Sequence, residues 1–207
     1  MKRREFIVGA GAAALMVPGS ASAALRCTNA DWRGIQQCEA GIPSLRIIPA
    51  LQRCPQWCWA ACIQMIFAKH RHRVSQEDIV AGLFGDLRCS PANGPQIARA
   101  VNSRRWRDSR GRRFYPKAFP LADFDFGVNN FSAAAQAARY LADGYPLING
   151  AVGHATVMTS MTYLRAPNGQ GEVQSIIVRD PWPGAGGRRM LTAREAYGTR
   201  LLLAIEV

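Results

Sequence analysis

The sequence predicts an α+β domain, and two observations favour this class. Helical patterns occupy residues 58–103, and an alanine-rich helical pattern follows over residues 133–142. After residue 146 the pattern changes to strands that are separated by glycine- and proline-containing turns. Helices first and antiparallel strands second, without a regular alternation of the two, is typical of an α+β plan.

The first 23 residues have the pattern of an export signal. Lys2-Arg3-Arg4 forms a charged start, residues 6–17 are apolar, and Ala21-Ser22-Ala23 offers a small-residue cleavage site. The arginine pair ahead of Phe6 and Ile7 resembles a twin-arginine signal, although a Sec signal that begins with two arginines fits as well. We therefore expect an exported protein, periplasmic or secreted in a bacterium.

The remainder of the chain has the length of a single domain. No later segment is long and apolar enough for a membrane-spanning helix, so we expect no stable membrane anchor. The formal net charge of the whole chain is +12, from 26 Lys and Arg against 14 Asp and Glu. Such a charge favours anionic surfaces in general and identifies no partner.

Six cysteines lie before residue 90, and an even number in an exported chain predicts disulfides. We expect Cys27 and Cys38 to close a short loop within an N-terminal extension over residues 24–47. A small propeptide is the alternative for that extension. The cysteines are Cys27, Cys38, Cys54, Cys58, Cys62 and Cys89.

If Cys58 is a free thiol, Cys89 can pair with either Cys54 or Cys62, and we favour Cys62. Four of these residues could instead hold zinc, but structural zinc sites usually have paired Cys-x-x-Cys spacing. Because the gaps here are three residues long, we expect no metal. The sequence likewise gives no sign of a cofactor.

Cys58 begins an apolar run to Ala68 that predicts a buried helix. Pro55 and the polar residues before Cys58 place this cysteine near the start of that helix. Unpaired backbone N–H groups and the helix dipole favour a thiolate there. Cys58 is therefore a candidate nucleophile.

Capping residues predict the other helices. Ser75 begins a helix that Gly85 ends, and Pro95 begins another that extends to about Ser103. Three further signals complete the set: Ser132 caps Ala133–Ala142, Gly144 ends it, and Thr192–Glu195 is a capping box before a short helix.

Strand patterns follow in the second half. The segment Phe119–Phe126 alternates apolar and polar residues, which fits an edge strand or a loop at a cleft. The four strands that we expect beyond it are Pro146–Val152, Ala155–Arg165, Glu172–Arg179 and Arg200–Val207.

Residues 99–117 combine many arginines with aromatic residues. This composition fits a surface for nucleic acid or an acidic substrate, but a solvated loop would have the same composition. Because no nucleic-acid-binding motif accompanies the segment, we expect no specific nucleic-acid partner. Its cations and aromatics are Arg99, Arg104, Arg105, Trp106, Arg107, Arg110, Arg112, Arg113, Phe114, Tyr115 and Lys117.

Only one of the three histidines has the context of a catalytic base. His70 and His72 lie among basic residues at an expected helix end, whereas His154 follows Gly153 in an apolar, strand-like segment. Asp180 comes directly after a predicted strand, and Pro181-Trp182 follows it.

The order of these elements resembles that of papain-like cysteine proteases. The resemblance is closest to double-glycine-type peptidase domains and to secreted avirulence-type proteases of bacteria, and it covers roughly residues 48–207. It predicts a papain-like fold, with the nucleophile helix in an N-terminal helical half and the histidine in a C-terminal antiparallel β half. The residues that carry the resemblance are Gln52, Trp57-Cys58-Trp59-Ala60-Ala61, Gly153-His154 and Asp180-Pro181-Trp182.

The resemblance implies a role for each of these positions. Cys58 would be the nucleophile, His154 the general base and Asp180 the residue that orients the histidine, while Gln52 would stabilise the oxyanion. Trp59, Gly153 and Trp182 would support the site or bind substrate, and Trp182 would pack over the His–Asp pair.

The chain departs from plant papains. Gln56 and Trp57 precede the cysteine, and His154 follows sooner than the ~130–150 residues of that family. We therefore expect a compact exported peptidase that acts on a peptide or protein substrate. The sequence does not indicate its oligomeric state. Transpeptidation or deamidation by the same residues is one alternative, and a catalytically silent basic binding module is another.

Overall fold

The computed structural model describes residues 24–42, 47–185 and 187–207. The expected export signal, residues 1–23, lies outside the described residues, as do residues 43–46 of the expected extension. No helix in the described ranges has the length and apolar character to cross a membrane.

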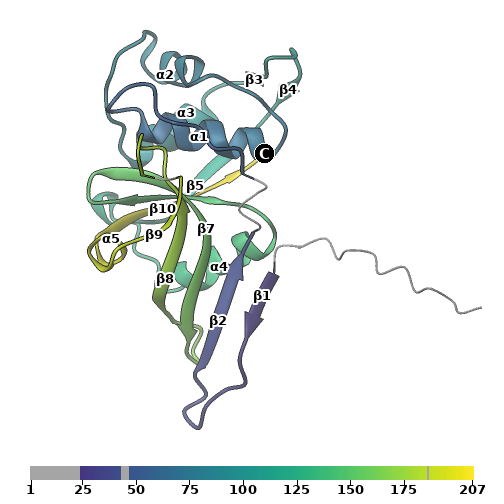
Figure 1. Ribbon diagram of the computed structural model, residues 1–207. Coiled ribbons are helices and arrows are strands. Elements are labelled where there is room, and N and C mark those ends of the chain that lie inside the picture. The colour runs from purple at the N-terminus through teal and green to yellow at the C-terminus, as the bar shows by residue number, and fades with distance from the viewer. Residues whose placement is uncertain (1–23, 43–46, 186) are drawn as a thin grey trace, which may run out of the picture.

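The chain forms helices and an antiparallel sheet, as expected for an α+β protein (Figure 1). The helices and the 3₁₀ turn are α1 (Cys58–Lys69), α2 (Gln76–Phe84), α3 (Gly94–Asn102), η2 (Phe124–Phe126), α4 (Ala133–Ala142) and α5 (Ala193–Tyr197). The strands are β1 (Ala24–Cys27), β2 (Gln36–Gly41), β3 (Trp106–Arg107), β4 (Arg113–Phe114), β5 (Lys117–Asp123), β6 (Leu147–Ala151), β7 (His154–Arg165), β8 (Gly171–Arg179), β9 (Arg188–Met190) and β10 (Thr199–Glu206).

Eight of the strands form one sheet, in the order β1-β2-β7-β6-β10-β5, with β8 paired to β7 and β9 paired to β8. The long strand β7 is its centre. Along one edge β7 pairs first with β6 and then with β2, and along the other edge it pairs with β8. The sheet therefore branches around β7, whose first residue is His154.

Helices cover both faces of the sheet, and the alternation along β10 shows this directly. Leu203 and Ile205 belong to the apolar cluster beneath α1, α2 and α3, whereas Leu202 and Ala204 belong to the cluster beneath α4. Successive side chains of a strand point to opposite faces, so β10 is buried on both sides. In Figure 1, α1–α3 and α4 lie on different sides of the sheet.

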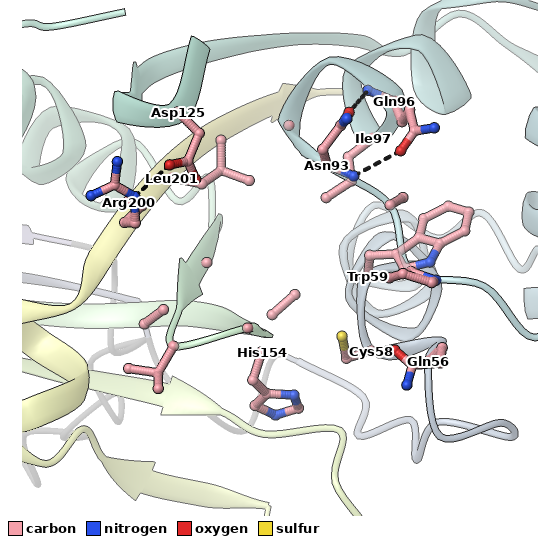
Figure 2. A pocket seen from close by; sticks show the side chains of 18 of the residues that line it. Gln56, Cys58, Trp59, Asn93, Gln96, Ile97, Asp125, His154, Arg200 and Leu201 are labelled. Carbon is pink, nitrogen blue, oxygen red and sulfur yellow. Dashed lines mark hydrogen bonds and ion pairs between the residues drawn. The ribbon is translucent and has the colours of Figure 1, made fainter. Parts of the chain in front are cut away.

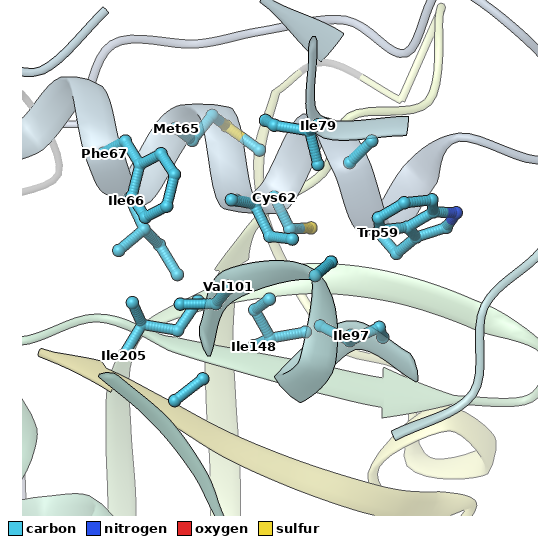
Figure 3. Packing of buried hydrophobic residues seen from close by; sticks show 14 of the residues in the cluster. Trp59, Cys62, Met65, Ile66, Phe67, Ile79, Ile97, Val101, Ile148 and Ile205 are labelled. Carbon is cyan, nitrogen blue, oxygen red and sulfur yellow. The ribbon is translucent and has the colours of Figure 1, made fainter. Parts of the chain in front are cut away.

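The helix α1 lies at the centre of the first cluster. It is apolar on nearly every face, and Figure 3 shows its Cys62, Ile66 and Phe67 above Val101 of α3 and Ile148 of β6. A helix that is apolar all round is stable only when it is buried on all sides. Its position is therefore fixed by α2, α3 and the sheet together.

The capping signals set the helix ends, with one exception. The Ser75 side chain accepts the Asp78 N–H at the start of α2, and Gly85 ends that helix with φ +80°. The expected capping box of α5 is present between Thr192 and Glu195. Ser132 makes no capping hydrogen bond to α4, because its hydroxyl donates to Asn130 Oδ1 at 2.8 Å.

One of the two expected disulfides is confirmed, and the other was assigned to the wrong partner. Cys27 pairs with Cys38, within the β1–β2 hairpin. Cys89 pairs with Cys54, not with Cys62. Cys62 is fully buried on α1 and is free, whereas Cys54 lies on the loop before α1, where it can reach Cys89.

Several short strands were not foreseen, namely β1, β2, β3, β4 and β9. The segment 24–41 forms a hairpin that extends the main sheet, because β2 pairs with β7. In the arginine-rich segment, the aromatic residues Trp106 and Phe114 are buried and pack on Phe67, so that the core uses two of the three aromatics.

Removal of the Phe67 ring should destabilise the protein strongly. Its ring is fully buried, with ring centroids 5.3 Å from Trp106 and 5.0 Å from Phe114. We expect Phe67→Ala to lower the free energy of unfolding by about 3–5 kcal/mol in denaturant titrations. Phe131, which is 85% exposed, is the matched control, and its replacement by alanine should change stability by less than about 0.5 kcal/mol. Equal losses for the two variants would contradict this account of the core.

Candidate active site

Cys58 is the first residue of α1, at a helix N-terminus that has no side-chain cap. The N-cap residue Trp57 offers no capping hydrogen bond, and the first turn contains no acidic residue. The N–H groups of this turn therefore remain available to an anion at the Cys58 position. The Cys58 side chain is half-buried, which leaves the sulfur accessible.

The loop before Cys58 is fixed at several points. The Trp57 backbone N–H donates to the Cys54 carbonyl at 3.0 Å, and the Trp57 indole N–H donates to the Arg88 carbonyl at 2.8 Å. The Cys54–Cys89 disulfide links the same two segments. Trp59, which is 1% exposed, donates its indole N–H to the Ser90 carbonyl and so adds a further link to that segment.

A tight turn between β6 and β7 places His154. Ala151 pairs directly with His154, so that only Val152 and Gly153 form the turn. Both have positive φ, +50° for Val152 and +75° for Gly153, which is the pattern of a two-residue type I′ hairpin. His154 is therefore the first residue of β7, and it lies beside a cavity that the start of α1 also lines.

Asp180 holds one nitrogen of the His154 ring. The His154 Nε2 to Asp180 Oδ1 distance is 2.8 Å, and the Trp182 backbone N–H donates to the same oxygen at 2.8 Å. Nδ1 of His154 is therefore left for Cys58. The Trp182 ring meets the His154 ring edge to face, with centroids 6.2 Å apart, although Trp182 is itself 48% exposed.

The charges of these three residues support one another. Burial alone would raise the pKa of the Cys58 thiol, but hydrogen bonds with His154 and the Ala155 N–H lower it below its ordinary value. Burial alone would lower the pKa of His154, yet its hydrogen bonds to Asp180 and Cys58 raise that pKa to about 9. Both shifts favour a thiolate–imidazolium pair near neutral pH.

Cys62 has the opposite environment although it lies one helical turn after Cys58. Complete burial raises the pKa of the Cys62 thiol well above its ordinary value, and the nearby Cys58 and Asp180 raise it further. Cys62 therefore stays a neutral thiol and packs as a small apolar side chain. The two free cysteines of the described residues have distinct chemistry because only one faces the cavity.

A cavity of about 920 Å³ lies between the helices and the sheet (Figure 2). Cys58 and His154 approach it from two sides, one from the start of α1 and the other from β7. Asp125 and Arg200, which form an ion pair at 2.5 Å, lie on a farther wall. The cavity is large enough for several residues of an extended peptide.

Gln52 lies near the site, where its backbone N–H donates to the Pro181 carbonyl, but it does not line the cavity. Its side-chain Nε2 donates to the carbonyls of Cys54 at 3.1 Å and Pro55 at 2.9 Å, which uses both N–H bonds. Its Oε1 is buried without a partner. Gln56, two residues before Cys58, instead lines the cavity beside the sulfur, as Figure 2 shows. The role of Gln52 as an oxyanion donor stays a prediction, and Gln56 is an alternative that the sequence reasoning missed.

Sequence reasoning also missed Arg189, which lines the cavity. Its Nε donates to Asp180 Oδ2 at 2.8 Å, on the side of the carboxylate opposite His154. The only sequence signal was indirect, because Glu195 of the predicted capping box is the second partner of Arg189. Within the described residues, no group of three or more His, Cys, Asp or Glu side chains could hold a metal ion.

The comparisons with known proteins find similarity among solved structures. No family model matches the chain, and no curated protein does. The chain is similar to a double glycine motif protease from an AMS/PCAT transporter, crystallised in complex with the leader peptide. The TM-score is 0.47 at 13% sequence identity, and the match covers 77% of this chain and 90% of that chain.

The strained turn before His154 gives a stability prediction. Val152 is a β-branched residue at positive φ, which costs about 1–3 kcal/mol, and it is 51% exposed. Asparagine suits this position of a type I′ turn, so Val152→Asn should raise the free energy of unfolding by about 1 kcal/mol. Val173→Asn, in the extended strand β8, should instead destabilise the protein. Chemical denaturation measures both, and a loss of stability in Val152→Asn would show that the turn is not strained.

Proposed function

We propose that this chain is a cysteine peptidase with a papain-like fold, whose peptidase domain is residues 48–207. The observation that carries the proposal is the placement of Cys58, His154 and Asp180 in one hydrogen-bonded series at the wall of a large cavity. Isolated residues of these types are common in protein cores. A cysteine whose pKa is lowered, beside a histidine whose pKa is raised, at an open cavity is instead typical of a nucleophile and its base.

In the first half of the proposed reaction, the Cys58 thiolate attacks the carbonyl carbon of a peptide bond. The carbonyl oxygen becomes negative, and the Cys58 backbone N–H at the helix start can donate to it. His154 then gives its Nδ1 proton to the departing amine as the C–N bond breaks. The product is a thioester on Cys58, with a neutral His154.

In the second half, water enters and His154 takes a proton from it. The resulting hydroxide attacks the thioester, the C–S bond breaks, and Cys58 leaves as a thiolate. The peptide acid departs, and the thiolate–imidazolium pair is restored. Throughout, Asp180 accepts a hydrogen bond from the Nε2–H group of His154 and so keeps Nδ1 directed at the sulfur and the substrate.

The oxyanion needs a second donor, which either Gln52 or Gln56 could supply. Gln52 has the spacing from the cysteine that the resemblance implies, but it would have to withdraw one N–H from the Cys54 or Pro55 carbonyl. Gln56 already faces the cavity. We keep Gln52 as the proposed donor, because one glutamine amide can exchange a carbonyl partner for a more strongly accepting oxyanion.

We also propose that the protein acts outside the cytoplasm and that residues 1–23 are its export signal. Two disulfides, Cys27–Cys38 and Cys54–Cys89, fit an oxidising compartment. The hairpin of residues 24–41 belongs to the sheet, so we propose it as a structural extension and not as a removable propeptide. The proposed substrate is a peptide or an extended protein segment.

Selective labelling of Cys58 tests the proposed nucleophile. At pH 7, iodoacetamide should modify Cys58 alone, and His154→Ala should slow that reaction by roughly 10- to 100-fold because the thiol returns to its ordinary pKa. In wild type the labelling rate should rise at a lower pH than in His154→Ala, since the pKa of the Cys58 thiol is lowered by its hydrogen bond with His154. Peptide mapping by mass spectrometry reads the site.

Cys62 is the internal control for this experiment, because its buried neutral thiol should stay unlabelled until the protein unfolds. Wild-type Cys58 that reacts no faster than in His154→Ala would overturn the proposal. Cleavage of a peptide library, followed by product mass, then separates hydrolysis from transfer to an amine.

A pair of variants decides which glutamine stabilises the oxyanion. Loss of one oxyanion donor typically lowers kcat by about 10²–10³-fold. We expect this loss in Gln52→Ala, with little change in Gln56→Ala, once a cleaved peptide is in hand. The opposite ranking would move the role to Gln56 and refute our assignment of Gln52. Thermal melting of both variants controls for the loss of the Gln52 loop bonds.

A further inference from the structure

The second oxygen of Asp180 is held as firmly as the first. Asp180 is 5% exposed, and Oδ1 accepts hydrogen bonds from His154 and from the Trp182 N–H. Oδ2 accepts from Arg189, with Nε at 2.8 Å and Nη2 at 2.7 Å. The buried carboxylate is therefore shared between one cation on each side, with the imidazolium on Oδ1 and the guanidinium on Oδ2.

Arg189 is in turn fixed from behind by Glu195. Nη1 and Nη2 of the guanidinium contact the two Glu195 oxygens at 2.8 and 2.6 Å. Glu195 is itself held by Thr192, whose backbone N–H and hydroxyl both donate to Oε2. Through its hydrogen bonds to Arg189 above all, the pKa of Glu195 falls to about 2, so it remains a carboxylate.

This arrangement places Arg189 in a series that connects β9 and α5 to His154. A bidentate pair with Glu195 and a forked contact with Asp180 fix the plane of the guanidinium, which a flexible lysine ammonium would not do. The Asp180 carboxylate consequently cannot rotate about its own axis without breaking bonds to Arg189. A misplacement of about 1 Å at such a supporting residue can slow a reaction by 10²-fold.

We propose that Arg189 is a positioning residue of the Cys58–His154–Asp180 group, which fixes Asp180 from the side opposite His154 and shares its negative charge, with Glu195 as its anchor. The positioning of His154 follows from the geometry alone. The consequence for catalysis rests on the proposed peptidase function.

If Arg189 shares the Asp180 charge, its own charge should affect the titration of His154. The charged groups that face His154 are Cys58 from α1 and Asp180 after β8, and Asp180 in turn faces Arg189. Arg189 draws part of the Asp180 charge away from the imidazolium. Removal of the guanidinium should therefore strengthen the attraction between Asp180 and His154, and removal of the Glu195 charge should weaken it.

The titration of the His154 ring by NMR tests this, with the signal assigned by its loss in His154→Gln. The wild-type midpoint is expected at about 9. Arg189→Gln should raise it by about one unit, and Glu195→Gln should lower it by about half a unit. Arg188→Gln is the matched control, because Arg188 is an exposed cation on the same strand, and its removal should leave the midpoint in place.

Two opposite shifts support the proposal. A midpoint that stays at the wild-type value, or that falls, in Arg189→Gln overturns it, because a purely structural arginine would lower the melting temperature without that shift. If Arg189→Gln fails to fold, the proposal is tested by Glu195→Gln alone, in which the titration midpoint of His154 should fall. None of these titrations needs an active enzyme, so unreactive Cys58 would refute the peptidase proposal and leave this result standing. Where a cleaved peptide exists, Arg189→Gln should also lower kcat by roughly 10- to 100-fold at little change in KM.

Discussion

The packing of α1 against the sheet is the constraint on which the rest of the site depends. The helix is apolar over most of its surface, it contacts β6, β7 and α2, and it shares one apolar cluster with α3. Its first residue is Cys58, and the first residue of β7 is His154. Because a buried helix cannot slide along a close-packed sheet without opening cavities, the distance between these two residues is fixed by the core.

Burial of charge is the second constraint, and the molecule solves it by pairing. An unpaired carboxylate as buried as Asp180 would be protonated or would destabilise the fold by several kcal/mol. Here each carboxylate oxygen meets a cation, and each cation meets a second anion, Cys58 in one direction and Glu195 in the other. The series thus alternates in sign from the cavity to α5. Such alternation would let the proposed Cys58 thiolate exist beside a compact core.

Much of the fold could be predicted from the sequence because its signals are local. Ser75, Gly85 and the capping box at Thr192 set helix ends through bonds within four residues, and glycines set the turns between strands. The order of Cys58, His154 and Asp180 could likewise be recognised along the chain. The features that were missed are the ones that depend on distant partners. The hairpin over residues 24–41 joins the sheet only through β7, which lies more than one hundred residues later.

The Cys54–Cys89 bridge and the contacts of Arg189 with Asp180 and Glu195 were also missed because they depend on distant partners. Whether Cys54 or Cys62 meets Cys89 depends on which side of α1 faces the core, and periodicity cannot decide that for a helix apolar all round. Arg189 looks like any cation of an exposed strand until β9 is paired to β8 and brought beside Asp180. The orientation of the Gln52 amide is equally invisible, because it is set by the carbonyls of Cys54 and Pro55.

The Cys54–Cys89 bridge makes the shape of the cavity depend on redox conditions. It joins the loop in front of Cys58 to the segment that leads into α3, and both border the cavity. The cross-link closes a loop of 35 residues. In the chain-entropy account it raises the free energy of unfolding by about 4 kcal/mol, because it lowers the entropy of the unfolded chain. Under reducing conditions the chain would lack this cross-link, and the two segments that border its cavity would be free to move apart.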